Sequence, residues 1–301
     1  MLDVRRLRLL RELHARGTIA AVADALQYTP SAVSQQLAVL EREAGVPLLE
    51  RIGRGVRLTP AGERLVEHAD AVLARLEAAE ADLATGGELR GRVRVAAFQT
   101  AARALVAPAF IELARTAPGI RTELLEIEAE DSLPLLRIGE IDVVVAEEYE
   151  HTPRPRDEAV ERRSLGLDRL MLALAEGHPG TRRAAGTLPL RDLSGEAWAA
   201  PRDGTAFTDE VCRLCRGAGG FEPDIRHQAN DVRLLLQLVA SGLAIALVPS
   251  LGREHEDGVV IRDTPRTREI FASVRRGAAV NPGVRAVLDA LTAHAERAGL
   301  S

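Results

Sequence analysis

Several residue types are scarce or absent in this chain of 301 residues, and each shortage narrows its range of functions. Its two cysteines, Cys212 and Cys215, form a single C-x-x-C pair, which is too few for a four-ligand zinc site. Scarce cysteine is typical of a reducing cytoplasm, so we interpret the pair as small packing residues rather than a redox switch. The seven histidines are scattered without partners at motif spacing, so we expect no metal or cofactor.

Aromatic residues make up only 3% of the chain, so leucine, valine, isoleucine and alanine must fill the core. No apolar run is long enough to span a bilayer, and the first residues start an amphipathic helix rather than a secretory signal. We therefore expect a soluble, cytoplasmic protein. The motifs of serine hydrolases, P-loop nucleotide-binding proteins and zinc metalloproteases are also missing, so the sequence gives no indication of an enzyme.

Lysine is absent as well, and all 39 basic residues are arginine. The net charge of −5 is unevenly distributed along the chain. Residues 1–60 hold nine arginines and six acidic residues, a charge of +3, which leaves −8 on the remainder. A basic amino-terminal part on an acidic body is typical of a protein whose first domain alone touches nucleic acid.

The basic part contains the pattern of two helices separated by a tight turn. Thr18 is a suitable N-cap for the first helix, and apolar residues then recur at helical spacing to Leu26. After a turn at residues 27–28, Thr29 caps a second helix that begins with Pro30. Polar side chains that lie off its apolar stripe suit the base edges and phosphates of a DNA major groove, namely Ser31, Ser34, Gln35 and Gln36, with Thr29 beside them.

A small hairpin at residues 52–59 follows the second helix. It has glycines for its turn and arginines at alternate positions, which is the composition of the wing in a winged helix-turn-helix. Arginines on a wing contact phosphates, which supply much of the affinity for DNA but little choice of sequence. We expect Arg51, Arg54 and Arg57 to have this role.

These motifs resemble the DNA-binding domain of LysR-type transcriptional regulators. The matching stretches are TPSAVSQ at residues 29–35, LLER at 48–51 and LTPAG at 58–62, in the family's order and spacing. The chain departs from the pattern at Leu49, where the family prefers phenylalanine. The resemblance implies double-stranded DNA, a small-molecule effector and RNA polymerase as partners, and a homodimer or homotetramer as the assembly. A helical pair that serves only protein contacts is the alternative.

A long helix is predicted from about residue 61 to 85. Its apolar residues recur in alternating steps of four and three from Leu65 to Leu83, and glycines at 86–87 end it. Together with the resemblance, this rhythm favours a linker and dimerisation helix (61–87) that sets two DNA-reading heads apart for two half-sites. The alternative is one amphipathic helix lying on its own domain.

From residue 91 onward strands alternate with helices, which predicts a parallel sheet with helices on both faces. Two such units, joined by two crossings, look like the periplasmic-binding-protein-like (type 2) effector domain of LysR regulators. We place lobe I at about 91–161 and 266–301, and lobe II at about 162–265. The predicted fold class is therefore α/β with an all-α head: a winged helix-turn-helix (1–60), a long linker helix, and a two-lobed effector domain (91–301).

Ligands of open α/β sheets bind beyond the carboxyl ends of the strands, near helix N-termini. Four stretches of the chain meet this rule, and each lies between a predicted strand and the element that follows it. They supply the effector-binding candidates, with Pro249 added at the end of a later strand: Phe98, Gln99, Thr100, Glu147, Glu148, Tyr149, Arg202, Thr205 and Asn230.

The two carboxylates at 147 and 148 favour an effector with a positive group, such as an amino acid or amine. A carboxylate effector held by Thr100, Thr205 and Arg202 is the alternative. The sequence thus predicts a DNA-binding transcriptional regulator that responds to a small molecule through a population shift between conformations. An architectural DNA-binding protein without an effector is the remaining alternative, although such a protein would not need two α/β lobes.

Overall fold

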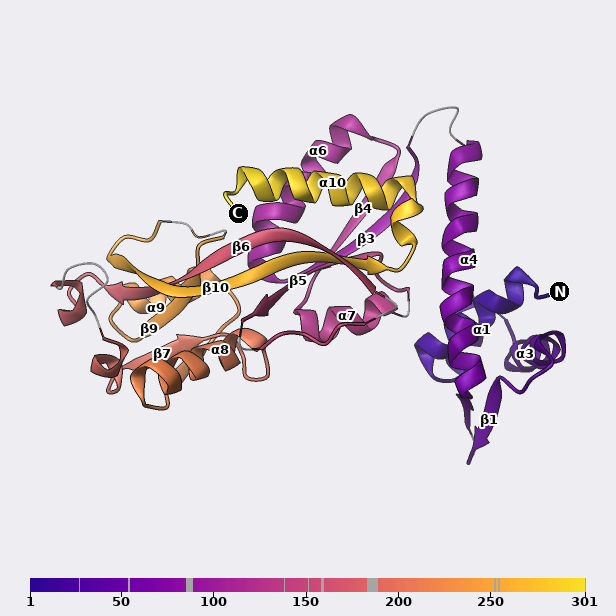
Figure 1. Ribbon diagram of the computed structural model, residues 1–301, viewed down its shortest axis with the longest axis horizontal. Coiled ribbons are helices and arrows are strands. Elements are labelled where there is room, and N and C mark those ends of the chain that lie inside the picture. The colour runs from indigo at the N-terminus through magenta and orange to yellow at the C-terminus, as the bar shows by residue number, and fades with distance from the viewer. Residues whose placement is uncertain are drawn as a thin grey trace.

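The computed structural model describes residues 1–26, 28–53, 55–84, 89–137, 139–150, 152–157, 160–182, 189–251, 253 and 255–300. A helical head and one long helix stand beside an elongated α/β domain (Figure 1). Within the described ranges, none of the helices combines the length and apolarity needed to cross a membrane.

The head is a bundle of short helices followed by a hairpin. Its elements are α1 (Val4–Arg16), α2 (Ile19–Leu26), α3 (Pro30–Ala44), β1 (Leu49–Ile52) and β2 (Gly55–Leu58). Two predicted caps are confirmed, because Thr18 Oγ1 accepts from the backbone N–H of Ala21 and Thr29 Oγ1 from that of Ala32, both at 3.2 Å. Each cap satisfies an N–H group that the first helical turn leaves without a partner.

Helix α4 (Pro60–Ala84) leaves the hairpin and runs past the head. Val66 and Ala69 are buried in the head's own core, whereas Val72 and Leu76 are 42% and 40% exposed. The predicted apolar repeat is therefore divided between an intramolecular face and an open face. The predicted helix end at residues 86–87 and the side chain of Leu83 lie outside the described part of the chain.

The start of α4 lies unusually close to the residue before β1, the first strand of the wing. A Cβ atom added to Gly62 would lie 2.3 Å from the backbone carbonyl oxygen of Leu48, well inside van der Waals contact. Only glycine therefore fits here without movement of the backbone. This contact gives a physical reason for the glycine that closes the LTPAG motif.

The α/β domain is built on one mixed sheet with the strand order β4-β3-β5-β10-β6-β9-β7-β8. The strands are β3 (Gly91–Ala97), β4 (Ile120–Glu126), β5 (Val143–Tyr149), β6 (Val160–Ala175), β7 (Ala197–Ala200), β8 (Asp224–Gln228), β9 (Ile245–Pro249) and β10 (Val259–Arg275). The predicted parallel pairing holds for β3 with β4 and β5, and for β7 with β8 and β9. It is wrong at the centre, where β10 is antiparallel to β5 and β6, and β6 is antiparallel to β9.

The two crossings between the lobes are continuous strands. Strands β6 and β10, of 16 and 17 residues, pair with each other from one lobe into the other. Their register shifts between Asp263 and Arg266, around Pro265. Proline has no N–H group to donate to a ladder, so an irregularity at this position lets the strand continue.

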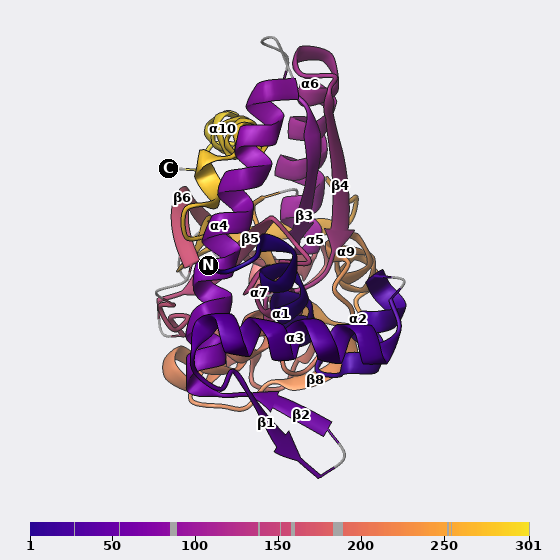
Figure 2. The ribbon, with the colours of Figure 1, turned by 90° about the vertical axis from the view of Figure 1, so that its right-hand side faces the viewer.

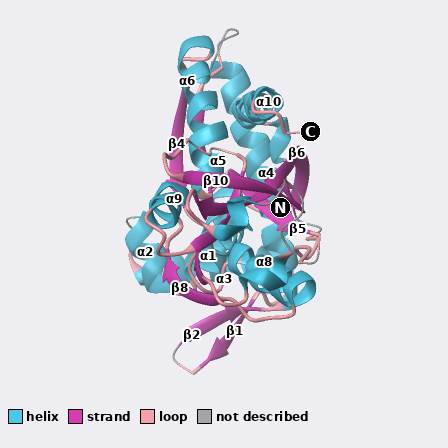
Figure 3. Ribbon diagram, turned by 90° about the vertical axis from the view of Figure 1, so that its left-hand side faces the viewer, coloured by secondary structure: helices cyan, strands magenta, loops and turns pink. Residues whose placement is uncertain are grey.

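Helices cover both faces of each lobe. They are α5 (Gln99–Ala101), α6 (Ala107–Thr116), α7 (Ala129–Arg137), α8 (Ala206–Leu214), α9 (Val232–Ala240) and α10 (Pro282–Arg297), with π-helical turns η1 (Ala102–Val106) and η4 (Cys215–Gly219) and 3₁₀ turns η2 (Pro179–Arg182), η3 (Leu190–Leu193) and η5 (Ala278–Val280). In lobe I, α6 and α10 share a core with one face of the sheet and α7 with the other (Figure 1). In lobe II, α8 and α9 do the same (Figure 3).

The head and α4 lie against the end of lobe I (Figure 2). Helix α4 contacts η5, and a Cβ built on Gly139 would lie 3.9 Å from Cδ of Arg11 in α1. A cavity of about 950 Å³ separates the rest of the two surfaces. Its lining is acidic on the α4 side and mostly basic on the lobe I side: Glu63, Glu67 and Asp70 against Arg137, Arg156, Arg275 and Arg276.

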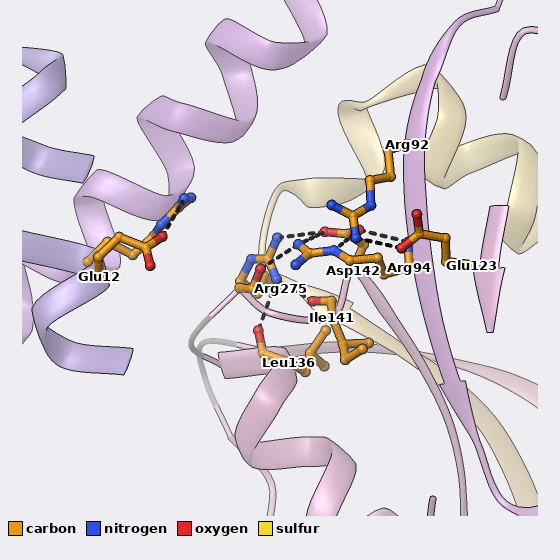
Figure 4. Close-up of polar contacts among 10 residues, drawn as sticks. Glu12, Arg92, Arg94, Glu123, Leu136, Ile141, Asp142 and Arg275 are labelled. Carbon is orange, nitrogen blue, oxygen red and sulfur yellow. Dashed lines mark hydrogen bonds and ion pairs between the residues drawn. The ribbon is translucent and has the colours of Figure 1, made fainter. Parts of the chain in front are cut away.

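Arg275 joins the last residues of β10 to this end of lobe I (Figure 4). Its Nη1 donates to the carbonyl oxygens of Leu136 at 2.9 Å and Ile141 at 2.7 Å. Its Nη2 lies 3.5 Å from Oδ1 of Asp142, which also forms an ion pair with Arg94 at 3.1 Å. The cluster therefore ties α7, β3 and β10 to the stretch before β5.

Candidate DNA-binding face and interlobe cleft

Helix α3 presents its predicted polar side chains to solvent. Ser31, Ser34 and Gln35 are exposed on the side away from the helix's buried residues, Val33, Leu37 and Leu40. Gln36 is exposed too, but its Oε1 accepts a hydrogen bond from Nε of Arg6 at 3.0 Å. The helix thus carries a polar face whose small donors and acceptors suit the edges of bases.

The wing projects beyond the head (Figure 2). Arg51 and Arg57 are exposed on its two strands, and Arg54 lies outside the described residues. Arg57 Nε donates to Oε1 of Glu50 at 2.9 Å, directly opposite in the hairpin register. A phosphate would therefore have to compete with Glu50 for Arg57, whereas Arg51 has no such acidic partner among the described residues.

One small cavity collects most of the predicted effector-binding residues at the cleft between the lobes. Its volume is about 30 Å³, which is room for one or two water molecules, so the lobes are closed on each other. Predicted residues that line it are Phe98, Gln99, Thr100, Glu147, Thr205, Asn230 and Pro249. Residues that the sequence analysis missed complete the lining: Glu128, Pro201, Phe207, Val232, Leu235 and Arg268.

Helix starts from both lobes lie at this cleft, as the strand-end rule predicts. Thr205 caps α8, accepting from the N–H of Thr208 at 3.3 Å, and Asp231 caps α9, accepting from the N–H of Arg233 at 2.8 Å. Phe98 directly precedes α5. The positive ends of these helix dipoles therefore lie near the cavity.

Hydrogen bonds across the cleft hold the lobes together. Asn230 Nδ2 of lobe II donates to Oε1 of Glu128 in lobe I at 2.7 Å. Gln99 Nε2 of lobe I donates to Oδ1 of Asp231 at 3.5 Å. The loops that carry the cavity residues are thus in direct contact from one lobe to the other.

Two carboxyl groups line the cavity in an environment that disfavours their charge. Glu147 is 3% exposed, and its Oε2 has no hydrogen-bond partner among the described residues. Burial raises the pKa of Glu147, in spite of Arg268 and Arg154 nearby. Burial, followed by the negative charges of Glu147 and Glu130, raises the pKa of Glu128 to about 7. Both carboxylates would be stabilised by an added positive group.

Arg268 of β10 is the buried cation of the cleft and is 3% exposed. Its Nε donates to Oδ2 of Asp168, and its Nη2 donates to Oγ1 of Thr100, both at 2.9 Å. The guanidinium carbon lies 4.8 Å from the ring centroid of Phe98 and 5.8 Å from that of Phe207. Burial alone would lower the pKa of Arg268, but the neighbouring acidic groups outweigh it and the pKa is raised.

Three predicted effector-binding residues do not line the cavity. Glu148 follows Glu147 on a strand and so points to the other face, where it pairs with Arg162 at 2.8 Å. Tyr149 is buried behind the cavity, with its ring stacked on Phe207 at 6.0 Å between centroids. Arg202 is exposed outside the lining, although its charge still lowers the pKa of Glu128 slightly against the effect of burial.

The cavity-lining residues that the sequence did not predict differ in how strongly their local sequence marks them. Glu128 follows β4, so the strand-end rule applied to that strand would have included it. Phe207 lies in the first turn of α8, two residues after the predicted Thr205, so its nearness in sequence to Thr205 is its signal. Arg268 and its partner Asp168 lie within long strands, where an arginine or aspartate carries no local sign of burial.

Comparisons with known proteins agree with this architecture. The family model described as "Bacterial regulatory helix-turn-helix protein, lysR family" matches residues 4–63, and the "LysR substrate binding domain" model matches residues 86–296. A hydrogen peroxide-inducible genes activator of Escherichia coli O6:H1 is 29% identical over 300 residues, covering 97% of this chain and 95% of that protein. The regulator TfdS of Cupriavidus pinatubonensis is 31% identical over 252 residues, covering 83% of each chain.

A solved full-length OxyR variant from Pseudomonas aeruginosa has the same fold, with a TM-score of 0.69 and 23% identity over 98% of this chain and 97% of that one. The relatives of the present chain by sequence are regulators of transcription, not enzymes. This chain is therefore a member of the LysR family of transcriptional regulators, as the two family models and the architecture of a helical head, a long helix and a two-lobed domain show.

Proposed function

We propose that this regulator responds to a small amine-bearing molecule, such as an amino acid or amine, which binds between its lobes when the cleft opens to admit it. The observation that carries the proposal is the pair of carboxyl groups of Glu128 and Glu147 on one buried cavity. An ammonium group between them would supply the positive charge that their burial requires. Arg268 and Arg154 supply it incompletely. Arg268 donates to Asp168 and Thr100 instead, and Arg154 Nη2 lies 3.6 Å from Oε1 of Glu147, so that Oε2 is without a hydrogen-bond partner among the described residues.

A carboxylate effector is the second candidate, and the helix N-termini at the cleft favour it. Thr100 and Thr205 line the cavity, as this candidate requires. Its third predicted residue, Arg202, is exposed outside the lining, and the two carboxyl groups would repel an anion. The balance of charge within the cavity therefore favours the amine.

Calorimetric titration of the full-length protein with amino acids, amines and organic acids decides between an amine and a carboxylate effector. We expect a member of the amine group to bind, and Glu147→Gln to weaken that binding at least about tenfold, because a charge-assisted hydrogen bond is lost. Tight binding of organic acids alone, unaffected by Glu147→Gln, would refute an amine effector.

The name of one relative raises peroxide sensing as a further possibility, and thiol chemistry argues against it in this chain. Cys215 is buried, and burial raises its pKa to about 12; burial also raises the pKa of Cys212. Thiolates attack peroxide as nucleophiles, and cysteines that react with it have lowered pKa values. The two cysteines therefore favour a ligand-responsive regulator over a thiol sensor.

On the DNA side, Ser31, Ser34 and Gln35 would read bases, and the wing arginines would hold phosphates. Two copies paired through the open face of α4 would present two recognition helices to two half-sites, with RNA polymerase as the protein partner in activation. An architectural protein would bind without sequence preference, which gives a direct test of this part of the proposal.

Selection from a randomised duplex library separates the two kinds of contact. Gln35→Ala should change which sequences are selected, because a base contact is lost. Arg51→Ala should weaken binding to all sequences alike and reduce its salt dependence, because a phosphate contact is lost. A uniform loss of affinity for Gln35→Ala would contradict its role as a reader of bases.

A further inference from the structure

We propose that Arg268 is a built-in ligand of the cleft, whose guanidinium binds partners in both lobes and holds the lobes closed. The regulatory meaning of this inference rests on the proposed function, but the closure itself does not. In a ligand-induced closure a bound molecule contacts both lobes and keeps them together; here the side chain of Arg268 makes those contacts.

The first support is the position of Arg268 on the strand that crosses between the lobes. In the register of the sheet it lies opposite Tyr149 of β5 on one side and Asp168 of β6 on the other. Its side chain is 3% exposed, and Asp168 is fully buried. Separation of this buried ion pair would leave an uncompensated charge, which costs stability, so the pair favours the present arrangement of the strands.

The second support is that its contacts divide between the lobes. Two contacts come from the start of the first helix of lobe I. Thr100 accepts a hydrogen bond from the guanidinium, and the ring of Phe98 lies against it. Phe207, at the start of α8, faces the same guanidinium from lobe II. Opening the cleft must separate the cation from at least one of the two rings.

The third support is the anchoring of Asp168. Its Oδ1 accepts from the hydroxyl of Ser250 at 2.7 Å and from the N–H of Leu251 at 2.8 Å, which leaves Oδ2 for Arg268. The carboxylate is therefore fixed in lobe II by the segment after β9. The guanidinium thus has two aromatic rings within about 6 Å of its carbon, and a carboxylate and a hydroxyl that accept its hydrogen bonds.

This arrangement predicts that free guanidinium ion replaces the side chain once it is removed. In full-length Arg268→Ala we expect the Tm to fall by roughly 5 °C or more, because Asp168 loses its buried partner. Hydrogen exchange should rise in the segments 98–101 and 205–211. Addition of 10 mM guanidinium chloride, too dilute to denature, should restore at least half of both changes, relative to 10 mM sodium chloride.

Matched variants decide whether the effect belongs to the cleft. Arg262→Ala removes an arginine six residues away on the same strand, whose guanidinium donates to the carbonyl oxygen of Thr181 at 2.6 Å, and free guanidinium should not restore its Tm. Adding Phe207→Leu to Arg268→Ala should abolish the recovery, because one wall of the cation site is lost. If Arg268→Ala does not fold, Phe207→Leu alone should raise exchange at residues 98–101 while the head remains protected.

Equal recovery of Arg262→Ala and Arg268→Ala, or no response of exchange at residues 98–101 in either cleft variant, would overturn the inference. Its failure is distinguishable from failure of the proposed function. If the wild-type protein binds no amine but Arg268→Ala recovers with guanidinium, only the proposed function fails. If the wild-type protein binds an amine but Arg268→Ala does not recover, only the present inference fails.

Discussion

Glu128 couples the stability of the closed cleft to pH. Its pKa of about 7 lies above the ordinary value of 4.5, chiefly because of burial. The folded protein therefore holds a proton that the unfolded chain has lost between these two pH values. The stability linked to this group is fully present below about pH 4.5 and is lost as the pH rises through 7.

The variant Glu128→Gln removes this titration while it keeps a similar shape. We expect its Tm to exceed that of the wild type by roughly 2–6 °C at pH 8 and to show no such gain at pH 4.5. Thermal melts at both pH values measure this difference, with the exposed Glu126→Gln as the matched control. An equal gain at the two pH values would mean that charge is not the cause.

At the level of residues, the sequence predicts positions better than it predicts burial. Phe98, Thr100 and Thr205 were identifiable because a strand end followed by a helix start is a local pattern. The role of Arg268 depends on which strands lie beside it, and these are about 100 residues away in the chain. Its neighbours Arg262 and Arg266 lie on the same strand, and their local sequences do not distinguish them from it.

Among the elements, the join between the wing and α4 depends on a close approach of two backbones. Gly62→Ala would place a methyl group 2.3 Å from the carbonyl oxygen of Leu48, so the helix start or the strand must move. We expect a loss of about 1–3 kcal/mol in the free energy of unfolding of the head. Urea denaturation followed by circular dichroism measures it. Gly195→Ala, where an added Cβ meets nothing within 4 Å, should have little effect.

The open face of α4 makes a separate prediction about assembly. Val72 and Leu76 are large apolar residues on one exposed stripe of this helix. Leu76→Arg should shift the protein towards smaller assemblies, because a charge would be buried without a partner in a helix pair. Analytical ultracentrifugation measures the shift. Val46→Arg, an equivalent change at an exposed apolar residue of the head, should leave the assembly unchanged.

Most element boundaries were predictable to within a few residues, because caps, prolines and apolar periods are local signals. In the head, α2 ends at Leu26 and α3 begins at Pro30, as predicted. The π-helical turn at Ala102–Val106 and the full lengths of β6 and β10 were not predictable. These features are decided by pairing and packing between distant segments, and a polar strand such as the start of β6 resembles a loop when its partner is unknown.

In the whole molecule, opposite charges face each other across the cavity between α4 and lobe I. Glu67→Arg would place a positive charge opposite arginines of lobe I, including Arg137 and Arg276. We expect faster hydrogen exchange where α1 meets residue 139, because repulsion loosens the head from lobe I. The effect should shrink at 0.5 M salt, where screening is stronger. Glu296→Arg, on the exposed end of α10, is the control, and an equal change there would contradict a local cause.

Strand β10 carries Arg268 in the cleft and Arg275 in the cluster that faces the head. Seven residues of extended chain separate them, a length of roughly 23 Å. The strand is paired on both sides along this length, although its register with β6 shifts between Ile270 and Phe271. We therefore expect a displacement of β10 in the cleft to reach the surface of lobe I beside the head through the strand itself, without a long series of side-chain contacts.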